Sequence, residues 1–319
     1  MITEKQVQAN RQPMSNPLSY VLISPARNEA AFIERTLQSV TSQTVLPLKW
    51  VIVSDGSNDG TDEIVKRYAA AHSWIELVRM PEHDERDFAA KVRAFDAGYS
   101  RVKGLDYGVI GNLDADITFD EGYIEFLLTK LQENPELGVI GTPFREGNLQ
   151  YDYRFTSSEH VSGACQLFRR ECFEAVGGYV PTKIGGVDLV AVITARMKGW
   201  RTRSFPEKVC FHHRKMGTGM TSDIGVCFKG GRGDYLLGGH PIWEIFRCMY
   251  QTKNKPLIIG GILRLLGFYW EFLRGTQKCV TQELVTFRRM EQMCRLKRFL
   301  RERLFLGNVS DGTAQLERG

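Results

Sequence analysis

Short apolar segments alternate with amphipathic segments over the first half of the chain. Runs of strand length occupy residues 20–23, 51–53, 75–78, 109–113 and 139–141. Between them, apolar residues recur about every 3.6 positions, as in a helix, at 30–41, 62–71, 88–99 and 123–134. Regular alternation of strands and helices is typical of βαβ units, so the sequence predicts an α/β protein with a Rossmann-like, mostly parallel sheet.

The second half of the chain is less regular and largely helical. A helical pattern covers 187–197, whereas residues 217–239 are rich in glycine and are predicted to form a mobile loop. The segment 256–273 is the most apolar of the chain, but Arg264 and Glu271 interrupt it. It barely reaches the roughly 20 residues that a membrane-spanning helix needs, so we expect a core or interfacial helix.

Basic and apolar residues alternate between 285 and 305. A basic amphipathic helix suits the surface of an anionic membrane, and this is the interpretation we adopt. Packing on the rest of the chain, with the basic face in water, is the alternative. The basic residues concerned are Arg288, Arg289, Arg295, Lys297, Arg298, Arg301 and Arg303.

Charge divides the chain into two parts. The net charge is +5, but residues 226–319 carry sixteen Lys and Arg against eight Asp and Glu, a net +8. The first 225 residues therefore carry −3, and the two parts are expected to face different partners. We predict a flexible arm at 1–17, a catalytic domain at 18–225 and a basic helical region at 226–319.

The cysteines and the N-terminal residues bear on the cellular compartment. Seven cysteines are scattered without any Cys-x-x-Cys pair, which predicts reduced thiols rather than disulfides or zinc ligands. Residues 1–16 are polar and contain no apolar segment, so a secretion signal is not expected there.

Aspartates follow several of the predicted strands. Asp55 opens the turn sequence Asp-Gly-Ser-Asn-Asp-Gly-Thr after 51–53, and Asp114 and Asp116 follow 109–113. The carboxyl ends of parallel strands form the edge at which open α/β sheets bind ligands. Two carboxylates one residue apart can reach a hard divalent cation that also takes phosphate oxygens. The pair therefore predicts a nucleotide-metal site, with a simple exposed turn as the alternative.

Several motifs in a fixed order make the chain similar to a known family. It resembles the family 2 glycosyltransferases from about residue 18 to about residue 213. That resemblance implies a GT-A fold, here with a C-terminal helical extension, and inverting sugar transfer from a nucleoside-diphosphate sugar to an acceptor hydroxyl. The motifs are Ser24-Pro25-Ala26-Arg27-Asn28-Glu29, Val51 to Thr61, Lys91-Val92-Arg93-Ala94, Asp114-Ala115-Asp116 and Gly177-Gly178-Tyr179.

The resemblance also implies a donor site. Asp55 would accept hydrogen bonds from the base or ribose, with an Asx-turn capping the helix near Thr61 as the alternative. Lys91 would pair with donor phosphate or with Asp114, the alternative being an exposed helical lysine. Arg214 and the lysine after it would close over the diphosphate. The implied donor-binding residues are Pro25, Ala26, Asn28, Glu29, Asp55, Lys91, Asp114, Ala115, Asp116 and Arg214.

The metal is expected to be Mn²⁺ or Mg²⁺. By resemblance, Asp116 is its direct ligand and Asp114 lies nearer the ribose or sugar. His212 aligns with a histidine that coordinates the metal or touches the diphosphate in some relatives, although the adjacent His213 leaves the register open. An imidazole ligand favours Mn²⁺. Asp188 matches the second acid of the family's Glu-Asp pair and is the expected general base, with an N-cap of the helix at 189–197 as the alternative.

Four positions depart from the family's pattern. Ser54 stands where many relatives carry a second aspartate, which weakens one nucleotide contact. Val187 replaces the first acid of the Glu-Asp pair, which puts its acceptor contact at risk. Ala90 stands in place of glycine, and Asp96 in place of asparagine, beside Lys91.

Two other classes compete with sugar transfer. A nucleotidyltransferase would need a glycine-rich loop after the first strand, and residues 24–29 contain no glycine. A non-catalytic membrane-associated scaffold would not need acidic residues at every candidate position. No nucleic-acid motif accompanies the basic region. We predict polysaccharide or glycolipid assembly, with an unknown hydroxyl acceptor for which a lipid-linked one is a candidate. The expected location is the cytoplasm or the cytoplasmic membrane face, bound peripherally. Polyprenyl-phosphate hexose synthesis is the alternative.

Overall fold

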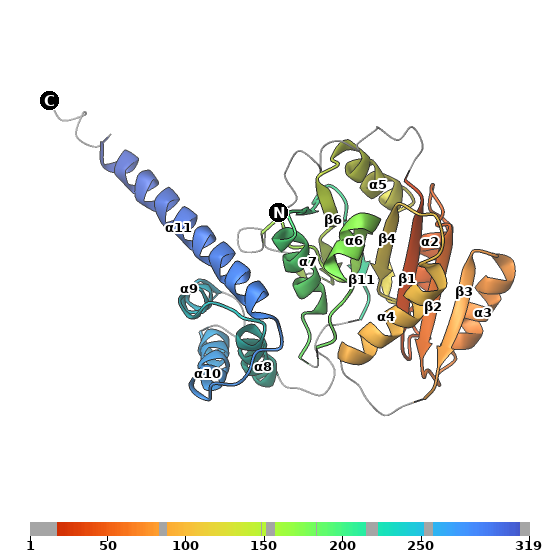
Figure 1. The fold of residues 1–319 in the computed structure, drawn as a ribbon, viewed down its shortest axis with the longest axis horizontal. Helices are drawn as coiled ribbons and strands as arrows, with labels where there is room; N and C mark the ends of the chain where they lie inside the picture. The colour runs from red at the N-terminus through yellow and green to blue at the C-terminus, as the bar shows by residue number, and fades with distance from the viewer. Residues whose placement is uncertain are drawn as a thin grey trace. The chain divides into compact units, whose positions relative to one another are not determined.

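The computed structural model describes residues 18–82, 88–147, 149–150, 157–182, 184–214, 223–251 and 258–312. The chain divides into two compact units, each described by itself below (Figure 1). The first contains residues 90–178 and 200–214 together with the chain up to 86, and the second contains 87–89, 179–199 and the chain from 215 onward. The arm predicted at 1–17 lies outside the described residues, and the domain boundary at 225 stays a prediction.

A seven-stranded sheet forms the centre of the first unit. Its strand order is β10-β6-β9-β4-β1-β2-β3. All neighbouring strands run parallel except β9, which is antiparallel to both β4 and β6, so the predicted mostly parallel sheet is confirmed. The strands are β1 (Tyr20–Ala26), β2 (Lys49–Asp55), β3 (Ile75–Met80), β4 (Val109–Leu113), β6 (Leu137–Gly141), β9 (Cys165–Arg169) and β10 (Arg201–Ser204).

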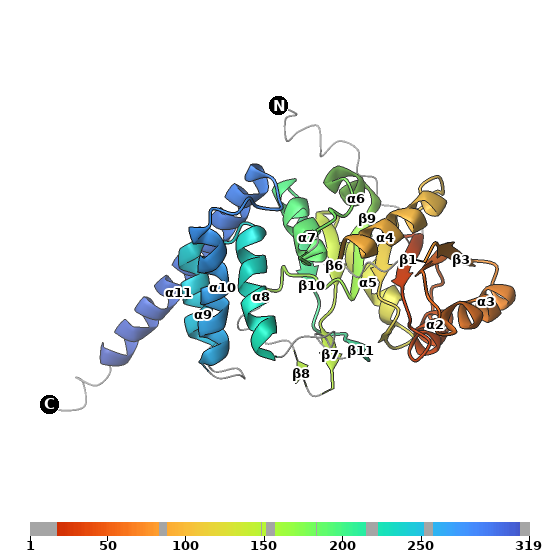
Figure 2. The ribbon, with the colours of Figure 1, turned by 90° about the horizontal axis from the view of Figure 1, so that it is seen from below.

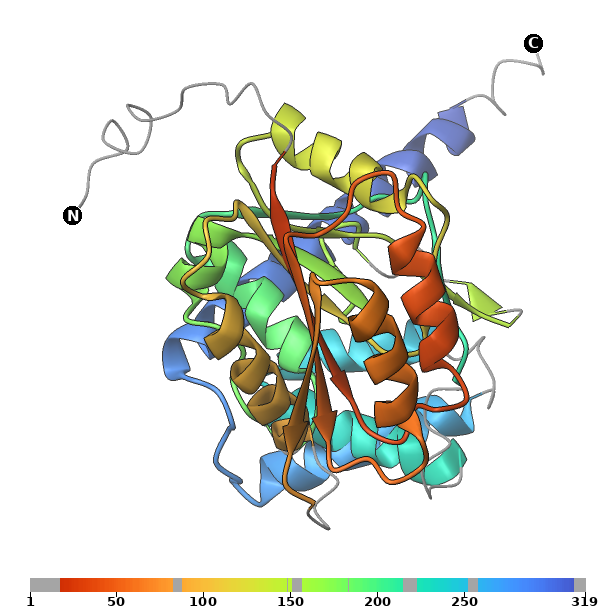
Figure 3. The ribbon, with the colours of Figure 1, turned by 90° about the vertical axis from the view of Figure 1, so that its right-hand side faces the viewer.

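Helices cover both faces of this sheet, as Figures 1 and 3 show. On one face lie α2 (Ile33–Thr41), α3 (Thr61–Ala71) and α5 (Tyr123–Glu133), whose apolar residues join one core cluster with the strands. On the other lie α4 (Phe88–Val102) and α6 (Arg170–Val176), where the rings of Phe95 and Phe173 are 5.8 Å apart. Both faces of the strands are therefore buried, which explains why they read as continuous apolar runs.

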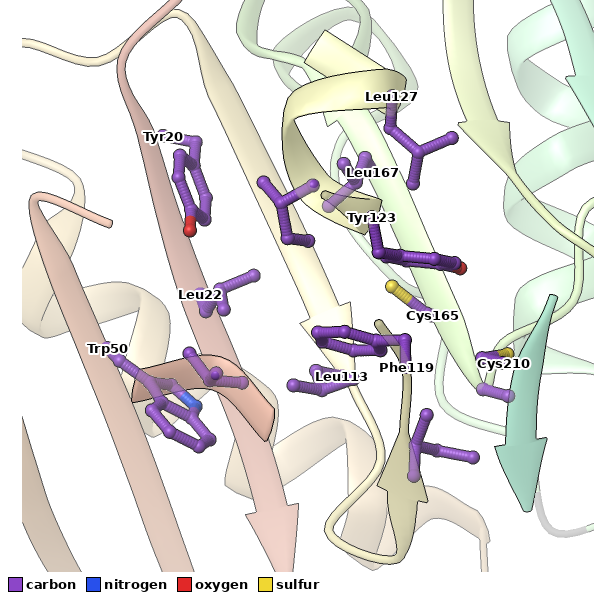
Figure 4. Packing of buried hydrophobic residues seen from close by; sticks show 14 of the residues in the cluster. Tyr20, Leu22, Trp50, Leu113, Phe119, Tyr123, Leu127, Cys165, Leu167 and Cys210 are labelled. Atoms are coloured by element: carbon purple, nitrogen blue, oxygen red, sulfur yellow. The ribbon is translucent and has the colours of Figure 1, made fainter. Parts of the chain in front are cut away.

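Large side chains fill the core on the side of the sheet that α2, α3 and α5 cover (Figure 4). Trp50 is fully buried and donates its indole N–H to the Ser24 hydroxyl at 2.9 Å. Tyr123 shares a 2.7 Å hydrogen bond with the hydroxyl of Thr142 and stacks on Phe119 with ring centroids 4.4 Å apart. Each buried polar atom among these has a partner, as burial requires.

A smaller sheet adjoins the large one within the first unit. It has the order β5-β11-β7-β8, with β5 (Ile117–Thr118), β7 (Phe144–Glu146), β8 (Leu149–Gln150) and β11 (Cys210–His212). β11 pairs antiparallel with β5, so that His212 lies opposite Ile117, and parallel with β7, so that Phe211 lies opposite Arg145. This pairing brings a late segment of the chain to the end of β4.

Helices make up the second unit, and Figure 2 shows α8, α9 and α10 side by side. They are α7 (Val187–Met197), α8 (Asp223–Leu236), α9 (Pro241–Gln251), α10 (Ile259–Leu273) and α11 (Gln282–Gly312). Arg196 of α7 forms a bidentate ion pair with Glu291 of α11 at 2.6 and 2.9 Å. Within the described residues, no helix has the length and apolar character required to cross a membrane.

The prediction of a mobile loop at 217–239 is wrong for most of that segment, because residues 223–236 form helix α8. Its glycines allow close packing instead. A Cβ atom on Gly231 would lie 1.9 Å from the carbonyl oxygen of Arg264 in α10, and one on Gly267 would lie 2.1 Å from that of Phe228 in α8. Small residues on both helices thus bring the two backbones into contact. Residues 217–222 lie outside the described part of the chain.

Substitution of Gly231 tests this contact. Gly231→Ala should lower the free energy of unfolding by about 1–3 kcal/mol, because the new methyl group overlaps the α10 backbone. Gly233→Ala is the matched control, since a Cβ atom there meets nothing within 4 Å and alanine favours the helix by up to about 1 kcal/mol. Urea unfolding followed by helical circular dichroism measures both. Equal stability of the two variants would contradict the close packing.

A buried ionic cluster joins four helices of the second unit. Asp234 of α8 accepts hydrogen bonds from Arg247, Arg264 and, at 3.3 Å, Arg288 of α11. Burial opposes ionisation of Asp234, but the three guanidinium groups outweigh it and hold its pKa well below the usual range. Arg288 is only 5% exposed, so this residue of the predicted basic face points into the unit.

Candidate functional site

Two loops at the C-terminal edge of the large sheet are bonded to each other. The backbone N–H of Asn28 donates to the Ser57 hydroxyl at 3.1 Å, and the Asn28 side-chain oxygen accepts from the N–H of Asn58 at 3.0 Å. The N–H of Glu29 donates to the Thr61 hydroxyl at 2.8 Å. Asn28 adopts φ 55°, a left-handed conformation that asparagine tolerates. The β1–α2 loop is thereby fixed against the loop after β2.

Asp55 lies at the end of β2 and is 5% exposed. Its carboxylate is 3.8 Å from the guanidinium of Arg27. Asp59 lies just before helix α3. Its carboxylate accepts hydrogen bonds from the N–H and hydroxyl of Thr61 at 3.1 and 2.5 Å and from the N–H of Ala30 at 3.0 Å. Asp59 therefore makes an Asx-turn at the start of α3.

Asp114, Asp116 and His212 form an acidic cluster beyond the end of β4. One potential ligand atom from each residue lies within 4.8 Å of the other two. The closest approach between imidazole and carboxylate is 3.5 Å, from His212 Nε2 to Asp116 Oδ2. Among the described residues this is the group of His, Cys, Asp and Glu side chains with the geometry to hold a metal ion. We refer to it as the DDH cluster.

The two adjacent histidines have different surroundings. His212 belongs to the DDH cluster, whereas the ring of His213 bonds the Thr118 hydroxyl at 2.8 Å through Nε2. The N–H of His213 donates to the carbonyl oxygen of Asp116 at 3.0 Å. Burial and the charge of Arg35 lower the pKa of His213. The pairing of β11 with β5 thus turns His212, and not His213, toward the two aspartates.

Glu146 at the end of β7 lies behind His212 and was not predicted from the sequence. Its Oε2 atom is 3.8 Å from His212 Nδ1, and both side chains are about nine-tenths buried. At this distance the two groups do not form a hydrogen bond, and Nδ1 is buried without a hydrogen-bond partner among the described residues, so Glu146 acts on His212 through its charge. The residue belongs to none of the recognised motifs, and only the pairing of β11 with β7 brings it here.

Two cationic side chains border the DDH cluster. Lys91 Nζ lies 2.5 Å from Asp114 Oδ1, so the sequence-based pairing of this lysine with Asp114 is present. Arg214 donates through Nη2 to Glu29 Oε2 at 2.5 Å and to the carbonyl oxygen of Asn28 at 3.1 Å. Its Nε atom is 3.9 Å from Asp116 Oδ2. Arg214 therefore connects the β1–α2 loop with the acidic cluster.

Crowding of carboxylates perturbs the acid groups of the cluster. Burial and the charge of Asp114 raise the pKa of Asp116, although His212, Arg214 and Lys91 act against this. Burial and the charge of Asp116 raise the pKa of Glu29 to about 7, while Arg214 lowers it. A divalent cation would relieve this repulsion, so two carboxylates and an imidazole fit Mn²⁺ or Mg²⁺.

The pKa of Glu29 predicts a pH-dependent effect on stability. Because its pKa is about 7 in the folded chain and about 4.5 unfolded, ionised Glu29 destabilises the fold, and stability is lost as the pH rises between these values. In metal-free buffer, the advantage of Glu29→Gln over wild type should grow across this interval, by at most roughly 3 kcal/mol. Urea unfolding at several pH values measures it, with the exposed Glu121→Gln as control. An advantage that does not change with pH would contradict the shifted pKa.

The remaining predicted residues lie at separate places. Pro25 and Ala26 end β1 beside Val53 and Ser54 of β2. The carbonyl oxygen of Ala115 accepts from the Thr36 hydroxyl at 2.8 Å, which anchors the segment between the two aspartates. Asp188 belongs to the second unit.

Asp188 lies in the first turn of α7 and is half-buried. The N-cap position is taken by Gly186, with φ 74°, rather than by Asp188. Asp188 is therefore not the helix cap that was considered as its alternative role. Its assignment as general base stays a prediction.

A seven-stranded, mostly parallel sheet with helices on both faces is the architecture of glycosyltransferases of the GT-A type. Residues 21–182, about half of the chain, match the family described as "Glycosyl transferase family 2". The chain belongs to this family.

Curated relatives include the poly-beta-1,6-N-acetyl-D-glucosamine synthases of two staphylococci. The protein of Staphylococcus aureus strain COL is 22% identical over 268 residues, and that of Staphylococcus epidermidis is 28% identical over 272 residues. Each match covers 77% of this chain but 61% of the relative. The chain thus spans less than two thirds of the length of these relatives.

Solved structures share the fold at low sequence identity. A mannosyltransferase from Pyrobaculum calidifontis in complex with GDP-Man and Mn²⁺ superposes with TM-score 0.56 at 19% identity, covering 82% of this chain and 76% of that chain. Staphylococcus aureus TarS 1–349 in complex with UDP-GlcNAc gives TM-score 0.53 at 12% identity, covering 79% and 72%. These likenesses confirm the predicted GT-A fold.

Proposed function

We propose that the chain transfers a hexose from a nucleoside-diphosphate sugar to an acceptor hydroxyl, with inversion at the sugar carbon. The observation that carries this proposal is the DDH cluster, bordered by Lys91 and Arg214, at the C-terminal edge of the sheet. Anionic and cationic groups alternate there within a few ångströms. Such an arrangement suits a metal ion together with a diphosphate.

The donor nucleotide is assigned to the two cross-bonded loops. Asp55 accepts hydrogen bonds from the base or ribose, and Pro25, Ala26, Asn28 and Glu29 line the nucleotide. A nucleoside diphosphate carries its negative charge toward Lys91 and Arg214. Arg214 exchanges part of its contact with Glu29 for a phosphate oxygen, which is favoured because the pKa of Glu29 is already raised.

Asp114, Asp116 and His212 are assigned to hold Mn²⁺ or Mg²⁺. When bound, the ion supplies positive charge that stabilises the departing nucleoside diphosphate. Asp188 takes the proton from the attacking acceptor hydroxyl. It does so late, because a carboxylate is a much weaker base than the alkoxide it would generate, so the position of Asp188 matters more than its pKa.

Polysaccharide or glycolipid assembly is the proposed context. The curated relatives are named as synthases of a poly-N-acetylglucosamine, and two structural neighbours are named as complexes with UDP-GlcNAc and GDP-Man. A hexose or N-acetylhexosamine donor is therefore the class to test first. Lipid-linked or exported polysaccharide is the favoured acceptor, and a polyprenyl phosphate is the alternative.

A donor screen tests the proposed function. Purified chain is incubated with UDP-, GDP- and dTDP-sugars, each with Mn²⁺, with Mg²⁺ and with chelator, and nucleoside diphosphate release is measured. Release from one donor class that stops with chelator supports the proposal and fixes the base and sugar. Release of pyrophosphate instead would assign the chain to the nucleotidyltransferases.

Glu146 should control metal affinity without contacting the ion. Glu146→Gln removes the charge beside His212 Nδ1 and, because no hydrogen bond is lost, should weaken Mn²⁺ binding by up to about 10-fold, the low end of the cost of losing an outer partner. The exposed Glu121→Gln serves as control. Calorimetric titration of the nucleotide-free chain with Mn²⁺ gives the affinity independently of turnover. Unchanged affinity in Glu146→Gln would show that His212 does not depend on this carboxylate.

A further inference from the structure

Helix α10 turns its charged residues inward. Arg264 donates to Asp234 and, at 3.2 Å, to Glu244, while Glu271 accepts from Arg232 and from the Thr276 hydroxyl at 2.5 Å each. Arg264 and Glu271 are the two charged residues in the sequence of this helix. The solvent side of α10 consequently carries no charge, the reverse of an ordinary surface helix.

Large apolar side chains occupy that solvent side. Their exposed fractions run from 51% for Ile262 to 82% for Leu273. Spacings of three and four residues align them along one side of the helix. A contiguous exposed apolar surface of this kind marks an interaction site. Its members, which we call the α10 stripe, are Ile258, Ile259, Ile262, Leu266, Trp270 and Leu273.

Helix α9 repeats the same inversion. Glu244 is 2% exposed and, with Arg247, bonds inside the unit, whereas Ile242 and Ile245 on the other side are exposed. The hydroxyl of Tyr269 donates to the carbonyl oxygen of Pro241, which holds the two helices together. In both helices the charged side chains thus form hydrogen bonds inside the unit, and aliphatic side chains are exposed to solvent.

We propose that the α10 stripe is an interfacial surface that inserts into the headgroup region of an anionic bilayer. The exposed Arg274 follows the stripe directly, and its guanidinium lies 5.5 Å from the ring centroid of Trp270. Apolar residues and a tryptophan beside a cation are typical of helices that lie in the membrane interface. The net +8 of residues 226–319 attracts anionic lipid and repels a second copy of the chain.

This surface differs from the one predicted from the sequence. The predicted membrane contact was the basic helix at 285–305, now part of α11, where Arg288 is buried against Asp234 and Arg289 donates to the carbonyl oxygen of Gly238. These two cations stabilise the unit. The apolar contact therefore moves to α10, and the exposed cations of the region contribute long-range attraction.

Vesicle flotation of the full chain tests the α10 stripe without any sugar substrate. The vesicles contain equal parts of phosphatidylcholine and phosphatidylglycerol, with pure phosphatidylcholine in parallel. Wild type should float with the anionic vesicles, and the double variant Ile262→Glu, Leu266→Glu should lose at least tenfold in bound fraction. The matched control is Leu46→Glu, Leu48→Glu, which places the same charges at exposed leucines of the first unit and should float like wild type.

A second measurement does not depend on a glutamate variant folding. Brominated phosphatidylcholine in the anionic vesicles should quench the tryptophan fluorescence of wild type more strongly than that of Trp270→Phe. Wild type that stays unbound, equal flotation of the stripe variant, or equal quenching would each overturn the proposal. It would also fail if the chain forms a dimer in solution that the stripe variant dissociates, since the stripe would then cover a second copy.

Discussion

Asp116→Ala should abolish metal-dependent binding of the donor nucleotide. Asp116 contributes to the DDH cluster, contacts His212 at 3.5 Å and lies 3.9 Å from Arg214, so its loss removes a metal ligand and a neighbour of the diphosphate together. Loss of a residue that only supports a metal ligand costs up to roughly 100-fold in affinity. Loss of the ligand Asp116 itself should therefore lower the Mn²⁺-dependent affinity for UDP or GDP by more than that. Calorimetry with and without Mn²⁺ measures this.

The control for this variant is Asp120→Ala. Asp120 lies four residues further along, is exposed and pairs with Lys208 at 2.7 Å. Its substitution therefore removes the same charge nearby and leaves the DDH cluster intact. Its nucleotide affinity should equal that of wild type. If Asp116→Ala binds nucleotide and Mn²⁺ as tightly as the control does, the metal assignment is wrong.

Asp188→Asn should separate binding from transfer. The amide keeps the shape of the side chain but accepts no proton, so the rate of transfer should fall about 10²- to 10⁴-fold. Donor affinity should stay the same, because the base acts on the acceptor hydroxyl. The rate of nucleoside diphosphate release with acceptor present, and the calorimetric donor affinity, are measured on the same preparation.

Loss of a negative charge in the first turn of α7 also weakens the helix slightly. Glu34→Gln controls for this, since Glu34 is likewise the second residue of its helix, α2, and is half-buried like Asp188. Turnover of Asp188→Asn close to that of Glu34→Gln would place the base elsewhere and leave Asp188 a role in helix stability only.

The α/β framework could be predicted because hydrophobic periodicity is a local property. The five predicted strands are β1, β2, β3, β4 and β6, and the four helices between them are α2 to α5. Strand β9 was missed. It is five residues long and inserts antiparallel between β4 and β6, and such pairing depends on residues far apart in sequence.

Glycine was misinterpreted for a physical reason. In residues 217–239 glycine was taken as a sign of backbone freedom. Gly230 and Gly231 instead lie against Arg264 of α10, where only a residue without a side chain allows such a close approach. Local composition does not distinguish these two uses. A glycine in the facing segment, Gly267, is the signal that could have shown it.

The site was predicted as far as motifs reach. Lys91, Asp114 and Asp116 come together as the resemblance implied, and the choice between His212 and His213 required the register of β11. Glu146 could not be found, because its neighbour His212 is 66 positions away and the two meet through a strand of three residues.

That three-residue strand, β11, has a consequence for how the site assembles. It ends in His212, and Arg214 follows two positions later, so one short segment delivers both the imidazole and the guanidinium to the acidic cluster. Its pairing with β5 also fixes the main chain at Asp116 through His213. The site is therefore complete only when this segment is folded, and a ligand that contacts both the cluster and Arg214 should stabilise the small sheet.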